Sequence, residues 1–174
     1  DTTVELVPTG NGNYTAWAND WNETEEGTAT ADCTGGGSGD GITSNTNNQR
    51  ESLTVSLSSI PNGSTITSIE VIAADRANAG AAAGGTYATF IRFNGTDSGN
   101  STAHAVANPG AGFSCSNTRN DTFDVTDTVK SAGTTLEIGV IKINSGGATN
   151  NSVRVGAMGV IVTYTPPPSY TINA

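Results

Sequence analysis

The chain carries few side chains suited to acid–base or nucleophilic chemistry. Its single histidine, His104, stands in the run STAHAVA, which alternates like a half-buried strand. A Ser-His-Asp site needs a nucleophile on a sharp turn and a histidine held by a partner, and a plain strand predicts neither. We therefore expect no catalytic residue here, and a substitution of His104 should affect stability only.

Paired carboxylates are the other chemistry to consider, because glycoside hydrolysis needs two of them at a set separation. The glutamates on expected strands are Glu5, Glu51, Glu70 and Glu137. They fall at polar-face positions, so a solvated sheet face explains them. We expect a protein that is not an enzyme.

Metal-binding residue types gather in one region of the chain. The acidic residues there are Asp20, Glu23, Glu25, Glu26, Asp32 and Asp40. Calcium prefers carboxylates and carbonyls from flexible loops, but the EF-hand spacing is missing. We expect a solvated acidic loop and no cofactor, with a structural calcium ion as the alternative. One histidine and two cysteines cannot complete a zinc set.

The two cysteines, Cys33 and Cys115, both stand in loop sequence rich in Gly, Ser and Asn. Neither has a CxxC neighbour. A pair in such loops favours a disulfide and hence an oxidising compartment, while two unrelated thiols are the alternative.

Sugar binding would use exposed aromatic platforms, for which Tyr14, Trp17, Trp21 and Tyr87 are the candidates. Aromatic residues make up only 6% of the chain, so the core needs them too. Trp17 and Trp21 have the even spacing of one strand face, which is more typical of core packing.

Glycan acceptors are numerous. N-x-S/T sequons begin at Asn13, Asn22, Asn62, Asn94, Asn100, Asn120 and Asn150. About four or five would arise by chance in a chain so rich in Asn, Ser and Thr, so the excess gives modest support for a decorated exterior.

Length, composition and net charge argue against several classes of function. The 174 residues suit one domain, and the net charge is −9 with 13% charged residues. No basic stripe is present to meet nucleic-acid phosphates or an anionic membrane surface. No apolar run is long enough to cross a bilayer.

The pattern along the chain is all-β. We expect strands at Thr3–Pro8, Thr15–Trp21, Glu51–Leu57, Ile66–Ala74, Thr86–Phe93, Ala103–Ala107, Asp121–Val125, Thr135–Ile143 and Val153–Thr165. Long loops are expected at Asn22–Gln49 and Arg76–Gly85, and turns at Ile60–Gly63 and Asn94–Gly95.

A short helical turn is predicted at Thr126–Ala132, because Thr126 or Asp127 can cap its start and Gly133 can end it. The domain then covers 1–165, and Pro166–Pro168 begins a tail over 166–174.

Two stretches resemble known families. Asp121–Val140, DTFDVTDTVKSAGTTLEIGV, is similar to a segment of galactose-binding-like jelly rolls, the fold of many carbohydrate-binding modules. The order VELVPTGNGNYTAW…W, ESLTVSLSSIPNGSTITSIEVIA, ATFIRFNGTD, VGAMGVIVTYTPP, which covers nearly the whole domain, resembles jelly-roll domains of phage structural proteins and bacterial surface proteins. That resemblance implies a non-catalytic surface, adhesion or fibre module. The tail PPPSYTINA resembles the linkers that follow such domains.

We therefore predict a jelly-roll β-sandwich of about eight antiparallel strands. It is expected to be an extracellular structural subunit of a surface appendage, fibre or virus particle, with copies of itself or other particle proteins as partners. Tyr170 and Ile172 alternate with polar residues, so the tail is a candidate subunit contact, with a disordered linker as the alternative. The other function considered is a carbohydrate-binding module of a larger secreted protein, with a glycan as ligand.

Overall fold

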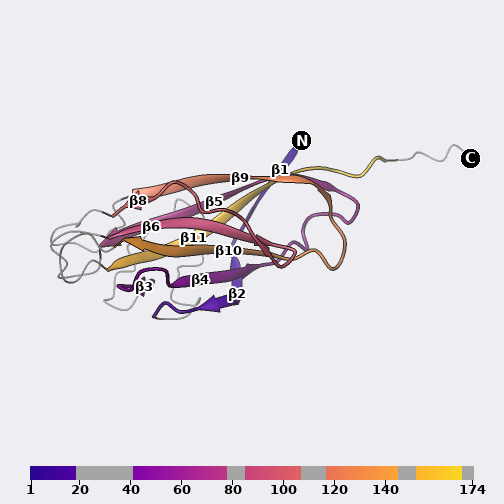
Figure 1. Ribbon diagram of the computed structural model, residues 1–174. Coiled ribbons are helices and arrows are strands. Elements are labelled where there is room, and N and C mark those ends of the chain that lie inside the picture. Colours follow the sequence, from indigo (N-terminus) through magenta and orange to yellow (C-terminus); the bar gives the residue numbers. More distant parts are fainter. Residues whose placement is uncertain (19–40, 78–84, 107–116, 145–151, 170–174) are drawn as a thin grey trace, which may run out of the picture.

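A computed structural model describes residues 1–18, 41–77, 85–106, 117–144 and 152–169, which form two packed antiparallel sheets (Figure 1). These residues contain no helix. The strands are β1 (Thr2–Leu6), β2 (Pro8–Thr15), β3 (Ile42–Ser44), β4 (Arg50–Val55), β5 (Thr65–Ala77), β6 (Thr86–Phe93), β7 (Thr96–Asp97), β8 (His104–Ala105), β9 (Asn117–Val129), β10 (Leu136–Asn144) and β11 (Val153–Thr165).

The strand order is that of a jelly roll. Sheet A runs β1-β11-β5-β9 with β3 added on β11, and sheet B runs β2-β4-β10-β6-β7 with β8 added on β6. When β2, β3 and β8 are left out and the other eight strands are counted in chain order, sheet A contains the first, eighth, third and sixth of them. Sheet B then contains the second, seventh, fourth and fifth, which is the double Greek-key order of the fold. The predicted fold class is confirmed from this connectivity.

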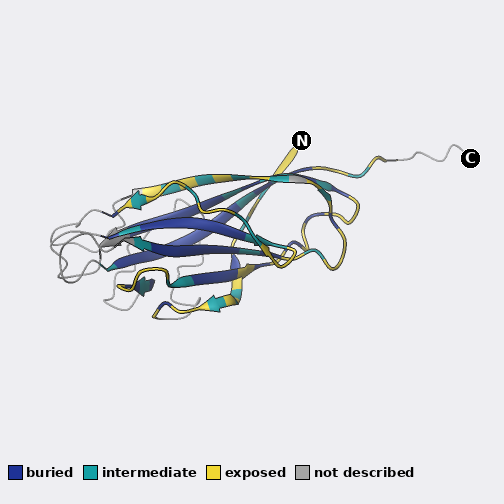
Figure 2. Cartoon of the chain, in the orientation of Figure 1, coloured by how far each residue is buried: buried dark blue, intermediate teal, exposed yellow. Residues whose placement is uncertain are grey.

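The core lies between the sheets because the inward positions of the long strands are apolar. In sheet B, Leu53 of β4 and Ile138 of β10 are register partners, and neither is exposed. In sheet A, Val71 of β5 pairs with Val160 of β11, again fully buried. Figure 2 shows this buried interior along β5, β6, β10 and β11.

Several sequence predictions hold in detail. Thr86–Phe93 and Val153–Thr165 are strands with the predicted bounds. The Ile60–Gly63 turn has Gly63 at φ 85°, and the Asn94–Gly95 turn has both residues at positive φ, 49° and 77°. Positive φ at both central residues is what a tight hairpin turn requires.

Three predictions are wrong. Thr126–Ala132 is not helical, because β9 pairs with β5 as far as Val129 and backbone pairing outweighs the capping signals. Part of the expected loop Asn22–Gln49 is a strand, β3, which pairs with the start of β11. The strand expected at Thr15–Trp21 does not continue past Thr15 in the described residues, where Ala18 forms only an isolated bridge with Thr43, and residues 19–21 lie outside them. The extra short strands bring the total to eleven described strands instead of about eight.

Candidate functional site

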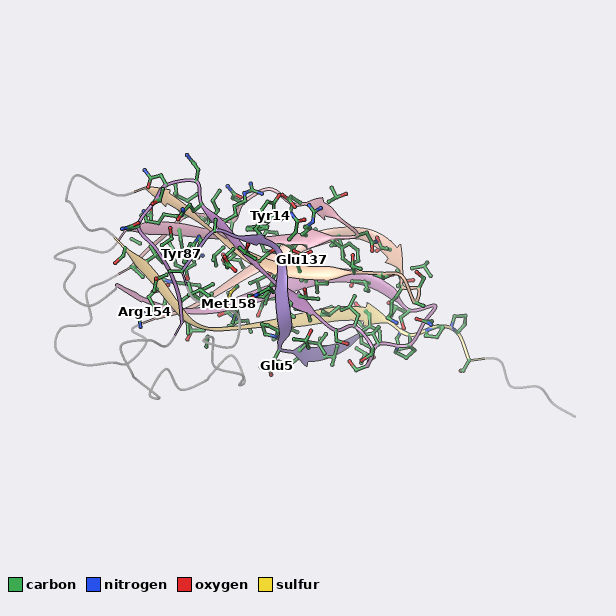
Figure 3. All side chains as sticks on the ribbon, turned by 90° about the horizontal axis from the view of Figure 1, so that it is seen from below. Glu5, Tyr14, Tyr87, Glu137, Arg154 and Met158 are labelled. Atoms are coloured by element: carbon green, nitrogen blue, oxygen red, sulfur yellow. The ribbon has the colours of Figure 1, made fainter. Side chains whose placement is uncertain are left out.

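A bulge in β2 builds the outer face of sheet B. Asn11 is opposite Leu53 and Thr15 is opposite Glu51, so three residues of β2 face Ser52 alone. Side chains replace the missing backbone partners: Asn13 N donates to Glu137 Oε2 (2.8 Å), and Tyr14 N donates to Ser52 Oγ (3.0 Å). The bulge turns Tyr14 onto the outer face, close to Glu137 in Figure 3.

Tyr14 there joins a compact group of charged and aromatic side chains, which we call the outer-face cluster (Tyr14, Arg50, Phe90, Arg92, Asp97). Asp97 Oδ2 accepts from the Tyr14 hydroxyl and from Arg50 Nη1, both at 2.6 Å, and Arg92 Nη1 donates to Oδ1 at 2.7 Å. The Arg50 guanidinium lies 4.9 Å from the Phe90 ring centroid. The one carboxylate of the cluster is thus bound by both of its guanidinium groups.

The environment of Asp97 favours its ionised form. Burial alone would raise the pKa of Asp97, but hydrogen bonds from Tyr14 and Arg92 and the charges of Arg92 and Arg50 lower that pKa below its ordinary value. The cluster therefore holds an anion between two cations at neutral pH.

The candidate aromatic platforms are occupied by packing. Trp17 is 5% exposed and Tyr87 is fully buried, so both belong to the core. The ring of Tyr14 meets Phe90 edge-on at 5.8 Å and lies 5.4 Å from the Arg50 guanidinium. Trp21 lies outside the described residues.

A polar group closes one side of the sandwich between sheet A and sheet B. His104 Nε2 on β8 lies 2.7 Å from Asp121 Oδ2 on β9, and Thr89 Oγ1 donates to the same oxygen at 2.6 Å. Arg119 of β9 donates from Nη2 to the Ala105 carbonyl at 2.8 Å. We call these five residues the clasp, because they tie β9 to β6 and β8 in the opposite sheet.

Beneath the clasp lies a buried carboxylate. Asp75 is fully buried, and its Oδ2 accepts from the Tyr87 hydroxyl (2.8 Å) and from Arg119 Nε (2.7 Å). Burial, followed by the charge and hydrogen bond of Asp75, raises the pKa of Tyr87 far above its ordinary value. The phenol therefore stays protonated and serves as a structural donor.

The clasp does not have the arrangement of a nucleophile and its base. Thr89 and His104 both bind Asp121, whereas an activated hydroxyl would donate to the histidine.

The prediction that the glutamates share a solvated face is wrong for Glu51, which is 1% exposed and accepts from Trp17 N at 3.0 Å. Glu51 lies two residues before Leu53, so alternation places it on the inward face of β4, where it holds the chain at Trp17.

The edge of sheet A at β9 is long and regular. Asn117 to Asp124 pair with Asp75 to Ser68 of β5 without a register shift, and a bulge follows. Within the described chain, no strand pairs with the other side of β9. Thr118, Asn120 and Thr122 are exposed, and Figure 2 shows β9 as a strip of exposed and half-buried residues.

The predicted site residues divide into two groups. Those outside the described residues are Cys33, Cys115, Tyr170, Ile172, Asn22 and Asn150. Those that are described are all exposed sequon asparagines: Asn13, Asn62, Asn94, Asn100 and Asn120. The disulfide, the tail contact and glycosylation therefore stay predictions.

The acidic loop also lies outside the described residues. In the part of the chain that is described, no three His, Cys, Asp or Glu side chains are grouped to hold a metal ion. No described helix is long and apolar enough to span a membrane.

The outer-face cluster was missed from sequence, although one signal for it existed. A two-residue turn at Asn94–Gly95 makes Phe93 the partner of Thr96 and Arg92 the partner of Asp97. An opposite-charge pair directly across a hairpin could therefore be read from the turn. The positions of Arg50 and Tyr14 beside Asp97 could not be predicted from the turn, because they depend on the order of strands in the sheet and on the bulge in β2.

No protein-family model matches the sequence, and no curated protein matches it. Among solved structures, the chain is similar to the Agl-KA catalytic domain (12% identity, TM-score 0.43, 99% of this chain and 29% of that one). It is also similar to carbohydrate-binding module CBM36 in complex with calcium and xylotriose (12%, 0.35, 95% and 100%). A third similarity is to infectious bursal disease virus, Gt strain (14%, 0.27, 97% and 38%).

The chain thus spans less than two fifths of the first and third of these structures and the whole length of the second. With TM-scores below 0.5, these likenesses carry no argument about function. The assignment of the jelly roll depends on the strand order.

Proposed function

We propose that the chain is a non-catalytic structural subunit on the exterior of a surface appendage, fibre or virus particle, which assembles through contacts between copies. The observation that carries the proposal is the edge of β9. Its regular stretch from Asn117 to Asp124 pairs with β5 on one side, and no described strand covers the other. An open edge of this kind presents unpaired backbone donors and acceptors to a strand from another chain.

The composition of β9 suits it to this role. It carries no lysine, the residue that most often guards an exposed edge, and three outward side chains of its regular stretch, Thr118, Asn120 and Thr122, are uncharged. The clasp also fixes β9 from inside, since Asp121 is bound to His104 and Thr89. A rigid edge loses little conformational entropy when a strand is added.

The tail is the proposed occupant of this edge in a neighbouring copy. Pro166–Pro168 follows β11 and leads away from the sandwich (Figure 1), and three prolines favour a stiff, extended path. The six residues Ser169–Ala174 would span about 20 Å as a strand, against roughly 27 Å for the eight residues of the regular edge. Tyr170 and Ile172 would then set the register from one face.

The non-catalytic part of the proposal is supported by how the reactive side chains are used. His104 and Asp121 join the two sheets, and Glu137 supports the β2 bulge. An extracellular location is supported by the exposed sequon asparagines and by the predicted Cys33–Cys115 disulfide.

Sedimentation velocity and negative-stain imaging of four proteins test the proposal. They are the full chain, a truncation after Pro168, the edge variant Thr122→Lys, and the control Ser59→Lys, which adds the same charge in an exposed turn. We expect the full chain and the control to associate as concentration rises, and the truncation and the edge variant to stay monomeric. Equal association by the truncated chain would contradict the role of the tail, and association by Thr122→Lys would contradict the role of β9.

A further inference from the structure

A cavity of about 520 Å³ opens where β4 ends and β10 begins. Two tight turns form its walls. In the first, Ile60 N donates to the Leu57 carbonyl (3.1 Å), and in the second, Ser131 N donates to Thr134 Oγ1 (2.9 Å). Both turns are closed by their own hydrogen bonds. Its volume is in the range of small-molecule sites, roughly 300–1,000 Å³.

Lys130 lines this cavity and is only 7% exposed. Its backbone is fixed, because its N–H donates to the Ser64 carbonyl and its carbonyl accepts from Gly63 N, both at 2.8 Å. Its ammonium donates to Asn62 Oδ1 at 2.6 Å, and no carboxylate of the described chain forms an ion pair with it. An ammonium has three donors, and burial of its charge is costly unless an anion is near.

The remaining lining combines apolar and hydroxyl groups. Leu57, Ile60 and Leu136 are buried and line the cavity, and Ser58 and Thr135 contribute exposed hydroxyl-bearing residues. Hydroxyl groups donate and accept, as the hydroxyls of a sugar ring do. Apolar carbons suit the C–H faces of such a ring.

We propose that this cavity binds an acidic sugar unit, whose carboxylate pairs with the Lys130 ammonium while its ring hydroxyls meet the serine and threonine side chains. The net negative charge of the chain should limit where a small anion can bind. The net charge is −9 and the chain has only seven basic residues, so most of the surface repels an anion. Binding of a small carboxylate should therefore be confined to this end of the sandwich.

The test is an amide chemical-shift titration of the ¹⁵N-labelled full chain with sodium glucuronate and, separately, with glucose at matched ionic strength. The two ligands differ in the carboxylate group. We expect glucuronate to shift the amides of 57–60, 62 and 130–135 saturably and glucose to bind about tenfold more weakly or worse, since a hydrogen bond to a charged group contributes at least that factor. Equal binding of the two sugars, or no saturable shift with glucuronate, would overturn the proposal.

Two substitutions separate charge from packing. Lys130→Met keeps the aliphatic stem and removes the charge, and Lys130→Arg keeps the charge. We expect glucuronate affinity to fall about tenfold or more in the first and to be largely retained in the second. Arg92→Met on the outer face removes one charge elsewhere and should leave the affinity unchanged. Undiminished binding by Lys130→Met would contradict the proposal, and if that variant does not fold, the comparison of the two sugars on the unmodified chain decides.

Discussion

Gly139 is a position where one added methyl group should clearly disturb the packing of the outer face of sheet B. It lies opposite Phe90 in the pairing of β10 with β6, and the Phe90 ring is fully buried. A Cβ at Gly139 would lie 2.6 Å from Phe90 Cε1 and 2.8 Å from the Glu51 carbonyl oxygen, so both ring and backbone must shift. Overpacking of this kind typically costs about 1–3 kcal/mol. Displacing Phe90 also weakens its contacts with Arg50 and Tyr14, so we expect Gly139→Ala to lower the free energy of unfolding by roughly 2–3 kcal/mol.

The measurement is urea unfolding followed by tryptophan fluorescence, with thermal unfolding as a second readout. For a chain of this length the expected loss corresponds to a melting temperature lower by roughly 4–12 °C. Gly10→Ala is the matched control, because a Cβ at Gly10 meets nothing within 4 Å. The control should change stability by no more than about 0.5 kcal/mol. If the two variants were equally stable, the packing described for the outer-face cluster would be wrong.

Three other predictions follow from the buried groups and the cysteines. Tyr87→Phe should lower stability by about 1–3 kcal/mol at neutral pH, since Asp75 loses a hydrogen-bond donor. The same substitution should make the free energy of unfolding, measured with urea, depend less on pH in the alkaline range. The reason is that the pKa of Tyr87 is raised in the folded state, so the free energy of unfolding falls as pH rises above about 10, where the unfolded phenol ionises. Asp97→Asn should lower stability by roughly 1–2 kcal/mol at pH 7. Because the pKa of Asp97 is lowered by folding, that difference should shrink as pH falls below about 4, and equal melting temperatures at pH 7 would contradict the role of the carboxylate. Mass mapping without reductant should find Cys33 bonded to Cys115, and two alkylated thiols would refute the bond.

The layered fold could be predicted from the sequence because most long strands alternate or are continuously apolar. Val153–Thr165 is buried from Val153 to Val160, and a central strand of a sandwich reads as such a run. The turn at Asn94–Gly95 could be predicted because positive φ limits which residues fit. The length of β9 could not be predicted, because the Thr and Asp residues at its end suit a helix cap as well as an edge strand. Only the pairing with Thr65 and Ile66 of β5 determines that this segment is a strand.

The polar groups of the interior were harder to foresee for a physical reason. Asp75 and Glu51 occupy inward positions, where alternation predicts apolar residues. Their carboxylates are accommodated because donors from distant segments, such as Arg119 and Trp17 N, reach them in the folded chain. Such partners are set by tertiary structure, so local pattern cannot supply them.

We have proposed that the edge of β9 that no described strand covers accepts a strand from a neighbouring copy. The decisive measurement is hydrogen–deuterium exchange, resolved by amide and compared between the assembled full chain and the monomeric truncation. We expect alternate amides within Asn117–Asp124 to exchange more slowly in the assembly, because a second strand pairs with those that β5 leaves open. Unchanged exchange along β9, with new protection on a different strand, would contradict it.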